Sequence, residues 1–208
     1  TIRLNQMVND KKELTTEQQI LDAAKKVFLS KGMAGARMQD IADEAGINKA
    51  LLHYYFRNKE KLFEVIFSEA AGKLFPRINE VFNSDLPLFE KFERFCEEYI
   101  SVVMENPYLP MFVLYEISQD PERFMEKVWA SGAKPEPARL MAQIQEEVAK
   151  GTIKWVHPVH LMMNLISMTL FPFVAKPMLQ ANFGFDEAQF MALMEQRKKE
   201  VPRFLIDA

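Results

Sequence analysis

Residues 48–63, which read NKALLHYYFRNKEKLF, gather the side chains of this chain with the clearest chemical potential. An imidazole, two phenols and four cations lie close together there: His53, Tyr54, Tyr55, Lys49, Arg57, Lys59 and Lys61. Cations are rare in a buried helix, and two adjacent tyrosines are not needed in a helix that only faces solvent. Cations bind phosphate, and imidazole and phenol groups can reach base edges in a major groove. The stretch therefore predicts contact with a charged partner such as DNA.

A helix is predicted before this stretch, over residues 16–31. Thr16 and Gln19 fit a capping box, in which a hydroxyl accepts from the first free N–H groups and the glutamine reaches back. Apolar residues then recur at helical spacing, and Gly32 ends the pattern.

Two shorter helices are predicted next, over residues 38–45 and 48–56. Gly46 suits the left-handed position after the first of them, and Asn48 can cap the second. Two short helices joined by a tight turn that contains glycine are typical of a helix-turn-helix. The sequence thus predicts such a motif, with its second helix in the chemically rich stretch.

The spacing of Leu52 and Phe56 fixes which face of this second helix is free. These two apolar residues are four apart and should anchor the helix to a core. The residues that then face outward, as candidates for base contacts, are Lys49, Ala50, His53 and Tyr54. Lys59 and Lys61 begin a fourth helix, capped by Asn58, whose free N–H groups can bind a phosphate.

The sequence does not predict a catalytic, metal or cofactor site. The adjacent pairs at 97–98 and 146–147 are glutamates that diverge by about 100° on a helix, so neither pair forms a two-carboxylate site. His157 and His160 have the spacing of a shared metal site, but a capping or surface role is the preferred interpretation because no acidic or thiol partner is near. We expect no enzyme activity, no metal and no cofactor.

Composition favours an all-α protein of two domains. The chain has 208 residues, of which 49% are hydrophobic and 26% charged, with seven glycines and no sustained alternating pattern of the kind strands need. Residues 1–61 carry a net charge of +3 within a total of −3, so the basic end is the one with the helix-turn-helix. We predict a DNA-binding domain over residues 1–61 and a larger helical domain over 62–208.

The sequence also predicts a cytoplasmic protein. The single cysteine, Cys96, excludes an intrachain disulfide, and the N-terminal residues have no apolar signal segment. The most apolar stretch, residues 161–175, contains Asn164 and Pro172 and is shorter than the roughly 20 residues of a membrane span. We interpret it as a helix buried in protein.

The run FLSKGMAGARMQDIADEAGINKALLHYYFRNKEKLF, residues 28–63, resembles the N-terminal DNA-binding domain of TetR-family transcriptional regulators. The resemblance rests on residues in the family order: Gly32, Ile41, Ala42, Ala45, Gly46, Leu52, His53, Tyr54, Tyr55, Phe56, Lys59 and Leu62. It implies that the rest of the chain binds an effector and forms the dimer. Two positions depart from the family: His53 stands where tyrosine is commoner, and Ala36 and Arg37 stand where a hydroxyl usually caps the second helix.

The resemblance also implies which residues touch DNA: Arg37, Gln39, Lys49, Ala50, His53, Tyr54, Tyr55 and Lys59. Arg37, Gln39 and Lys59 are then expected on phosphates. Tyr55 stays open, because its spacing from Leu52 also suits the core.

Beyond residue 63, prolines and apolar periodicity predict helices over roughly 62–82, 87–105, 108–117, 121–130, 136–150, 157–180 and 186–205. Methionine adapts to irregular apolar ligands, and the chain has 13 methionines and 17 phenylalanines. We expect an effector pocket lined by Phe95, Tyr99, Phe112, Tyr115, Met163, Ser167 and Phe171. A closed core without a ligand is the alternative.

The last two predicted helices are the expected dimer interface, because their apolar residues exceed what one core face needs. A two-fold dimer implies a palindromic operator with half-sites roughly 34 Å apart. We therefore predict a homodimeric regulator of transcription, a repressor by resemblance, that binds double-stranded DNA and is released by a small apolar or amphipathic effector. The alternative is a helix-turn-helix module without an effector.

Overall fold

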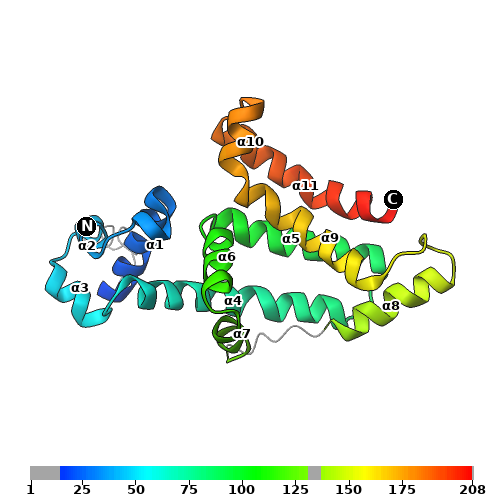
Figure 1. The fold of residues 1–208 in the computed structure, drawn as a ribbon, viewed down its shortest axis with the longest axis horizontal. Coiled ribbons are helices and arrows are strands. Elements are labelled where there is room, and N and C mark those ends of the chain that lie inside the picture. Colours follow the sequence, from blue (N-terminus) through cyan, green and yellow to red (C-terminus); the bar gives the residue numbers. More distant parts are fainter. Residues whose placement is uncertain (1–14, 131–136, 208) are drawn as a thin grey trace, which may run out of the picture. The chain divides into compact units, whose positions relative to one another are not determined.

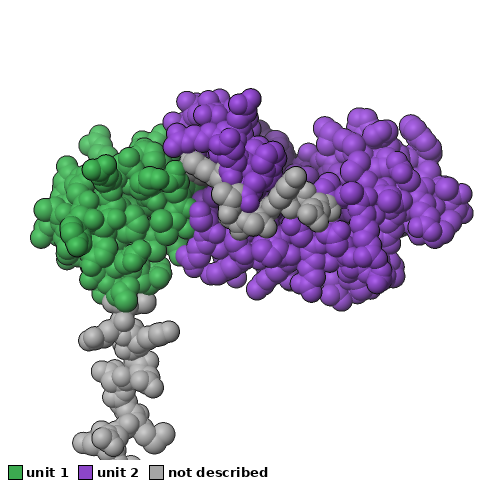
Figure 2. Space-filling view, turned by 90° about the horizontal axis from the view of Figure 1, so that it is seen from below, with its two compact units in different colours: residues 1–66 green, residues 67–208 purple. Residues whose placement is uncertain are grey.

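A computed structural model describes residues 15–130 and 137–207, and the described chain is helical, as the sequence predicts. Its helices are α1 (Thr16–Gly35), α2 (Met38–Ala45), α3 (Lys49–Tyr55), α4 (Lys59–Asn83), α5 (Leu88–Glu105), α6 (Leu109–Gln119), α7 (Pro121–Ala130), α8 (Ala138–Ala149), α9 (Pro158–Val174), α10 (Lys176–Phe183) and α11 (Glu187–Asp207) (Figure 1). They form two compact units that divide after Ile66 (Figure 2). The long helix α4 belongs to both.

The first unit packs α1 against α2 and α2 against α3. Its core holds the apolar face of α1 together with Ile41, Leu52 and residues at the start of α4. Phe28 and Phe63 meet edge to face, with ring centroids 5.5 Å apart. This contact joins the first helix to α4.

Helix ends in the first unit follow local side-chain chemistry. Gly46 ends α2 in the left-handed conformation, with φ of 67°. The Asn48 carboxamide accepts a 2.7 Å bond from the Leu51 N–H and so caps α3, as predicted. The predicted cap at Thr16 is wrong by one residue, because the hydroxyl of Thr15 accepts from the Gln18 N–H. Gly32, with φ of 67°, interrupts α1 where the sequence predicted its end.

The second unit is built around α5, which packs against α8, α9 and α11. Its core is apolar and includes Phe92, Ile100, Leu140, Leu165 and Phe190. Polar contacts gather at the turn between α4 and α5. There the buried Lys91 ammonium donates to the Phe82 carbonyl at 3.0 Å, and Arg139 from α8 pairs with Asp85.

The helix predicted over residues 157–180 is in fact two helices, α9 and α10, which are bent by 69° at Ala175. Pro177 explains the break, because it has no N–H to donate to the carbonyl of Phe173 and its ring clashes there. No single described helix has both the length and the apolarity to cross a membrane, although α9 and α10 pass that test as a bent pair.

Candidate nucleic-acid interface and apolar cavity

The free face of α3 is set by two anchors. Leu52 is 0% exposed and Phe56 is buried, so both point into the first unit, as the sequence predicts. The side chains left in solvent are Lys49, Ala50, His53 and Tyr54, the last of them 84% exposed. A cation, a small residue and two hydrogen-bonding rings thus share one accessible face of a short helix. That combination suits direct contact with base edges.

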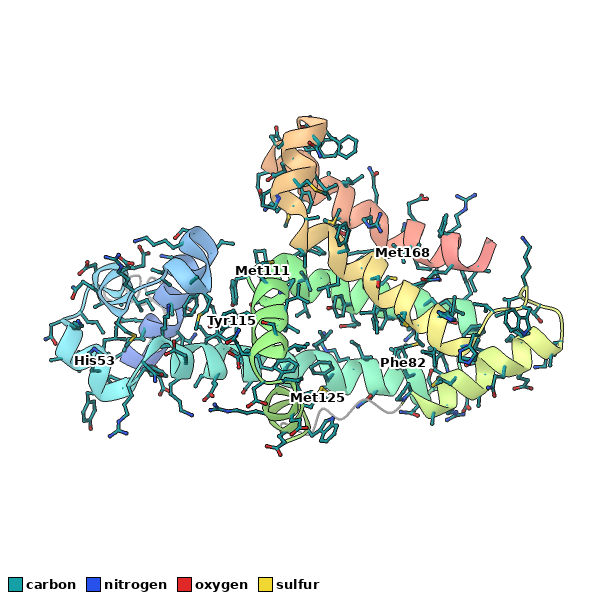
Figure 3. All side chains as sticks on the ribbon, in the orientation of Figure 1. His53, Phe82, Met111, Tyr115, Met125 and Met168 are labelled. Carbon is teal, nitrogen blue, oxygen red and sulfur yellow. The ribbon has the colours of Figure 1, made fainter. Side chains whose placement is uncertain are left out.

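Rings at the end of α3 are held in defined orientations. His53 Nδ1 lies 3.1 Å from the carbonyl oxygen of Arg57 (Figure 3 shows His53). Because a carbonyl only accepts, Nδ1 is the donor in this contact, which leaves Nε2 for a partner outside the chain. Tyr54 and Tyr55 meet edge to face with centroids 5.5 Å apart, and Tyr55 is 41% exposed. Tyr55 therefore belongs to the surface more than to the core.

Arg37 and Gln39 are exposed at the start of α2. Where the family usually has a hydroxyl cap, the Asp40 carboxylate accepts from the Arg37 N–H at 3.2 Å and pairs with Lys31 at 2.9 Å. The hydrogen bond from Lys31 lowers the pKa of Asp40. Gln39 donates to Asp43 at 2.7 Å, which orients its amide. Asp40 thus supplies the contact from the third helical position back to residue 37, as in one half of a capping box.

Lys59, which was expected to bind a phosphate, contacts the backbone at the end of α1. Its ammonium donates to the carbonyl oxygens of Met33, Ala34 and Ala36, at 2.8, 3.4 and 3.2 Å. These carbonyls follow the break at Gly32 and have lost their helical partners. Lys59 therefore fastens the start of α4 to the end of α1. Three backbone oxygens thus lie within hydrogen-bond distance of an ammonium that has three protons to donate.

An apolar cavity of about 630 Å³ lies within the second unit. Its size falls in the usual range for small-molecule sites, roughly 300–1,000 Å³. Five helices supply most of its wall. The residues that line it include Phe67, Ala71, Phe82, Phe95, Tyr99, Leu114, Phe124, Met125, Met141, Met162 and Met163. Figure 3 shows two of them, Phe82 on α4 and Met125 on α7.

Three of the predicted pocket residues, Phe95, Tyr99 and Met163, line this cavity. Tyr115, Ser167 and Phe171 do not: they are exposed on other faces of their helices, and Figure 3 shows Tyr115 on α6. Phe112 lies in α6, but its side chain falls outside the described residues.

Two of the predicted pocket residues that do not line the cavity are only one position away, along α9, from residues that do. Ile166 and Leu170 of α9 line the cavity, and Ser167 and Phe171 follow each of them directly, about 100° further round the helix. Periodicity defines such faces but does not say which neighbour each face meets. The methionines Met125 and Met141, which also line the cavity, come from helices that the sequence analysis did not connect with it.

Burial keeps two titratable groups of the second unit, Cys96 and Tyr99, neutral. Burial raises the pKa of the Cys96 thiol to about 12, so this cysteine is a packing residue and not a nucleophile. Burial also raises the pKa of Tyr99 to about 12. His157 caps α9 by accepting from the Val159 N–H at 3.3 Å. Within the described residues no cluster of three or more histidine, cysteine or acidic side chains could hold a metal ion.

Comparison with known proteins agrees with this arrangement. Residues 20–66 match the model of the family described as bacterial regulatory proteins, tetR family. An uncharacterized HTH-type transcriptional regulator of Bacillus subtilis, YhgD, is 27% identical over 149 residues, which cover 67% of this chain and 72% of the relative. The fatty acid metabolism regulator protein of the same organism is 26% identical over 110 residues, 53% of this chain and 57% of the relative.

Among solved structures, the transcriptional regulator FadR from Bacillus subtilis in complex with stearoyl-CoA shares the fold, with a TM-score of 0.60. The match covers 90% of this chain and 96% of that one at 21% identity.

Proposed function

Because the chain belongs to the tetR family of bacterial regulatory proteins and is a DNA-binding transcriptional regulator, not an enzyme, we propose how it regulates. It binds a palindromic operator as a homodimer and represses transcription, and an apolar or amphipathic effector releases it. The observation that carries the proposal is the exposed face of α3, opposite its buried anchors Leu52 and Phe56.

On this face, the residues proposed to contact base edges are Lys49, Ala50, His53 and Tyr54, and Tyr55 is exposed beside them. Arg37 and Gln39 at the start of α2 are assigned to phosphates, since side chains and N–H groups at a helix start suit an anion. Lys59 was expected on a phosphate as well. Its three backbone contacts support a different role, in which it positions the helices around the exposed face of α3, the reading face.

A homodimer through the C-terminal helices is supported by apolar surface. Large side chains on α9, α10 and α11 are exposed in the single chain: Phe171, Met178, Phe183, Leu193 and Phe204. Apolar surface of this kind marks a protein interface more often than a solvated face. A second copy of the chain is the proposed occupant, which places two reading faces on one operator.

Release by an effector is supported by the cavity and by α4. This helix begins at Lys59 in the first unit and lines the cavity from Phe67 onward. A ligand that favours one arrangement of α4 therefore acts on a helix whose first turns belong to the first unit, which carries the reading face. Such a ligand lowers DNA affinity only by as much as it prefers the non-binding state. The stearoyl-CoA bound by the fold neighbour makes a long acyl chain a reasonable first candidate.

Selection of bound sequences from a random duplex pool tests the proposal, followed by the salt dependence of the best binder. A palindrome with half-sites about one helical turn apart supports a dimeric regulator. Apolar and amphipathic compounds are then added to the complex, and release is measured by fluorescence anisotropy. Binding to one motif without release by any compound favours the module that has no effector. Enrichment of no motif contradicts sequence-specific regulation.

A further inference from the structure

The cavity wall has a rigid aromatic side and an adaptable side. Phe82, Phe95 and Tyr99 stack in sequence, with successive ring centroids 5.5 Å apart and interplanar angles of 12° and 16°. Facing helices contribute flexible thioether side chains, among them Met125 and Met162. The stack fixes the direction of the Tyr99 ring, so its hydroxyl has a defined place in an otherwise adaptable site.

This hydroxyl is the polar group of the wall that has no protein partner and is not fully buried. Within the described part of the chain it forms no hydrogen bond, and its neighbour in the stack, Phe95, offers none. The other polar side chain in the wall, Asn79, already has contacts of its own. Because Tyr99 is only half-buried, its hydroxyl keeps access to water. A ligand that displaces this water leaves the hydroxyl without a partner unless a ligand atom accepts its proton.

The charge of the wall limits what that ligand atom can be. None of the described side chains that line the cavity carries a charge. Burial raises the pKa of Tyr99 to about 12, so at neutral pH the phenol is a hydrogen-bond donor and does not become a phenolate. An ionised carboxylate entering this wall would lose its hydration without meeting a cation, whereas a neutral carbonyl loses little.

We propose that Tyr99 donates a hydrogen bond to a neutral oxygen acceptor on the effector, so that the cavity selects long-chain esters or thioesters over the free acids. This inference rests on the proposed effector function of the cavity and specifies the chemistry of the ligand. Tyr99 is then the residue that distinguishes an acyl carbonyl from plain hydrocarbon, and the apolar wall is what excludes the carboxylate.

The test measures direct binding of a matched set of ligands to the full chain by calorimetry: dodecane, methyl dodecanoate and dodecanoate at neutral pH. For the natural sequence we expect the ester to bind about tenfold more tightly than the alkane, the size of one well-formed hydrogen bond. The acid should also bind more weakly than the ester, because its carboxylate loses hydration in the apolar wall. Tyr99→Phe keeps the ring stack and should bind ester and alkane equally. Tyr115→Phe, an exposed tyrosine outside the cavity, is the matched control and should leave the preference intact.

The outcomes separate this inference from the effector proposal. If no ligand of the set binds the natural sequence, the apolar effector site itself is contradicted, and the role of Tyr99 falls with it. If the ligands bind but the acid binds as tightly as the ester, or Tyr99→Phe keeps the ester preference, the cavity stands and the inference about Tyr99 is overturned. Thermal unfolding of both variants verifies that they are folded.

Discussion

Polar contacts define helix ends in both units, but the second unit also packs its apolar side chains around a space that they do not fill. Thr15, Gly46 and Asn48 define helix ends in the first unit, and Lys59 joins two of its helices. In the second unit Asp120, His157 and Asp186 cap α7, α9 and α11, and Lys91 holds the α4–α5 turn. What sets the second unit apart is a cavity of about 630 Å³ beside its core of phenylalanine, leucine and isoleucine.

This difference suits the two tasks. Base recognition needs side chains held in a fixed geometry, and caps with directional hydrogen bonds provide it. An apolar effector needs a space that can adapt, and four methionines in the cavity wall provide that: Met125, Met141, Met162 and Met163. A cavity also leaves its wall with fewer packing partners, so the second unit should tolerate changes that the first does not.

The largest expected effect comes from making the same change in each unit. Leu52→Ala removes a fully buried anchor of α3 and should cost about 2–5 kcal/mol of unfolding free energy, because tight packing cannot collapse around the gap. Leu114→Ala removes a cavity-wall residue that is 40% exposed and should cost well under about 1 kcal/mol. Urea unfolding followed by circular dichroism measures both. Equal costs would contradict the contrast between the two units.

Lys59 offers the next test, because a clamp and a phosphate contact respond differently to salt. Lys59→Met leaves three carbonyl oxygens without their donor and should lower stability by about 1–3 kcal/mol. The slope of log affinity against log salt should stay unchanged, since no phosphate contact is lost. Arg37→Met, at an exposed position assigned to a phosphate, should instead reduce that slope by about 1.

Lys59→Arg is the conservative control, and it should recover part of the lost stability. If the salt slope falls with Lys59→Met as it does with Arg37→Met, Lys59 contacts a phosphate and does not act only as a clamp between helices.

Local chemistry made the first unit readable from its sequence. Gly46 and Asn48 mark helix ends through their own backbone and side-chain preferences, so α2 and α3 appear where they were predicted. Lys59 was harder to interpret, because the carbonyls it binds lie 23 to 26 residues away. Sequence spacing carries no information about such a contact.

The second unit was predictable in its helices but not in its cavity. Helical periodicity identified most elements, and it failed at Ala175 because one proline can be tolerated, as Pro172 is within α9, while Pro177 ends the helix. The pocket residues Ser167 and Phe171 were misplaced because an apolar helix such as α9 is apolar on several faces. Which face meets a neighbour depends on packing between distant segments.

Tyr54 tests whether a residue of the reading face contributes to recognition without contributing to stability. Tyr54→Ala should leave stability unchanged, because the side chain is 84% exposed, while discrimination between the best operator and a mismatched one falls by about 1–3 kcal/mol. Competition binding with matched and mismatched duplexes measures this. If both affinity and sequence preference survive in Tyr54→Ala and Lys49→Ala, the recognition face has been placed wrongly.

The smallest effect on stability, and the most specific effect on function, is expected from filling the cavity. Ala71 is buried on α4 and lines the space, so Ala71→Leu adds apolar volume where room exists and should change unfolding free energy by no more than about 1 kcal/mol. The reading face lies on α3 and keeps its anchors, so operator affinity without effector should stay the same. Release by the effector should be lost, because the added side chain occupies its place. Ala142→Leu, at an exposed position of α8, is the matched control and should respond to effector like the natural sequence. If Ala71→Leu is released as readily as that control, the effector acts elsewhere, and the adaptable character of the second unit serves some purpose other than binding it.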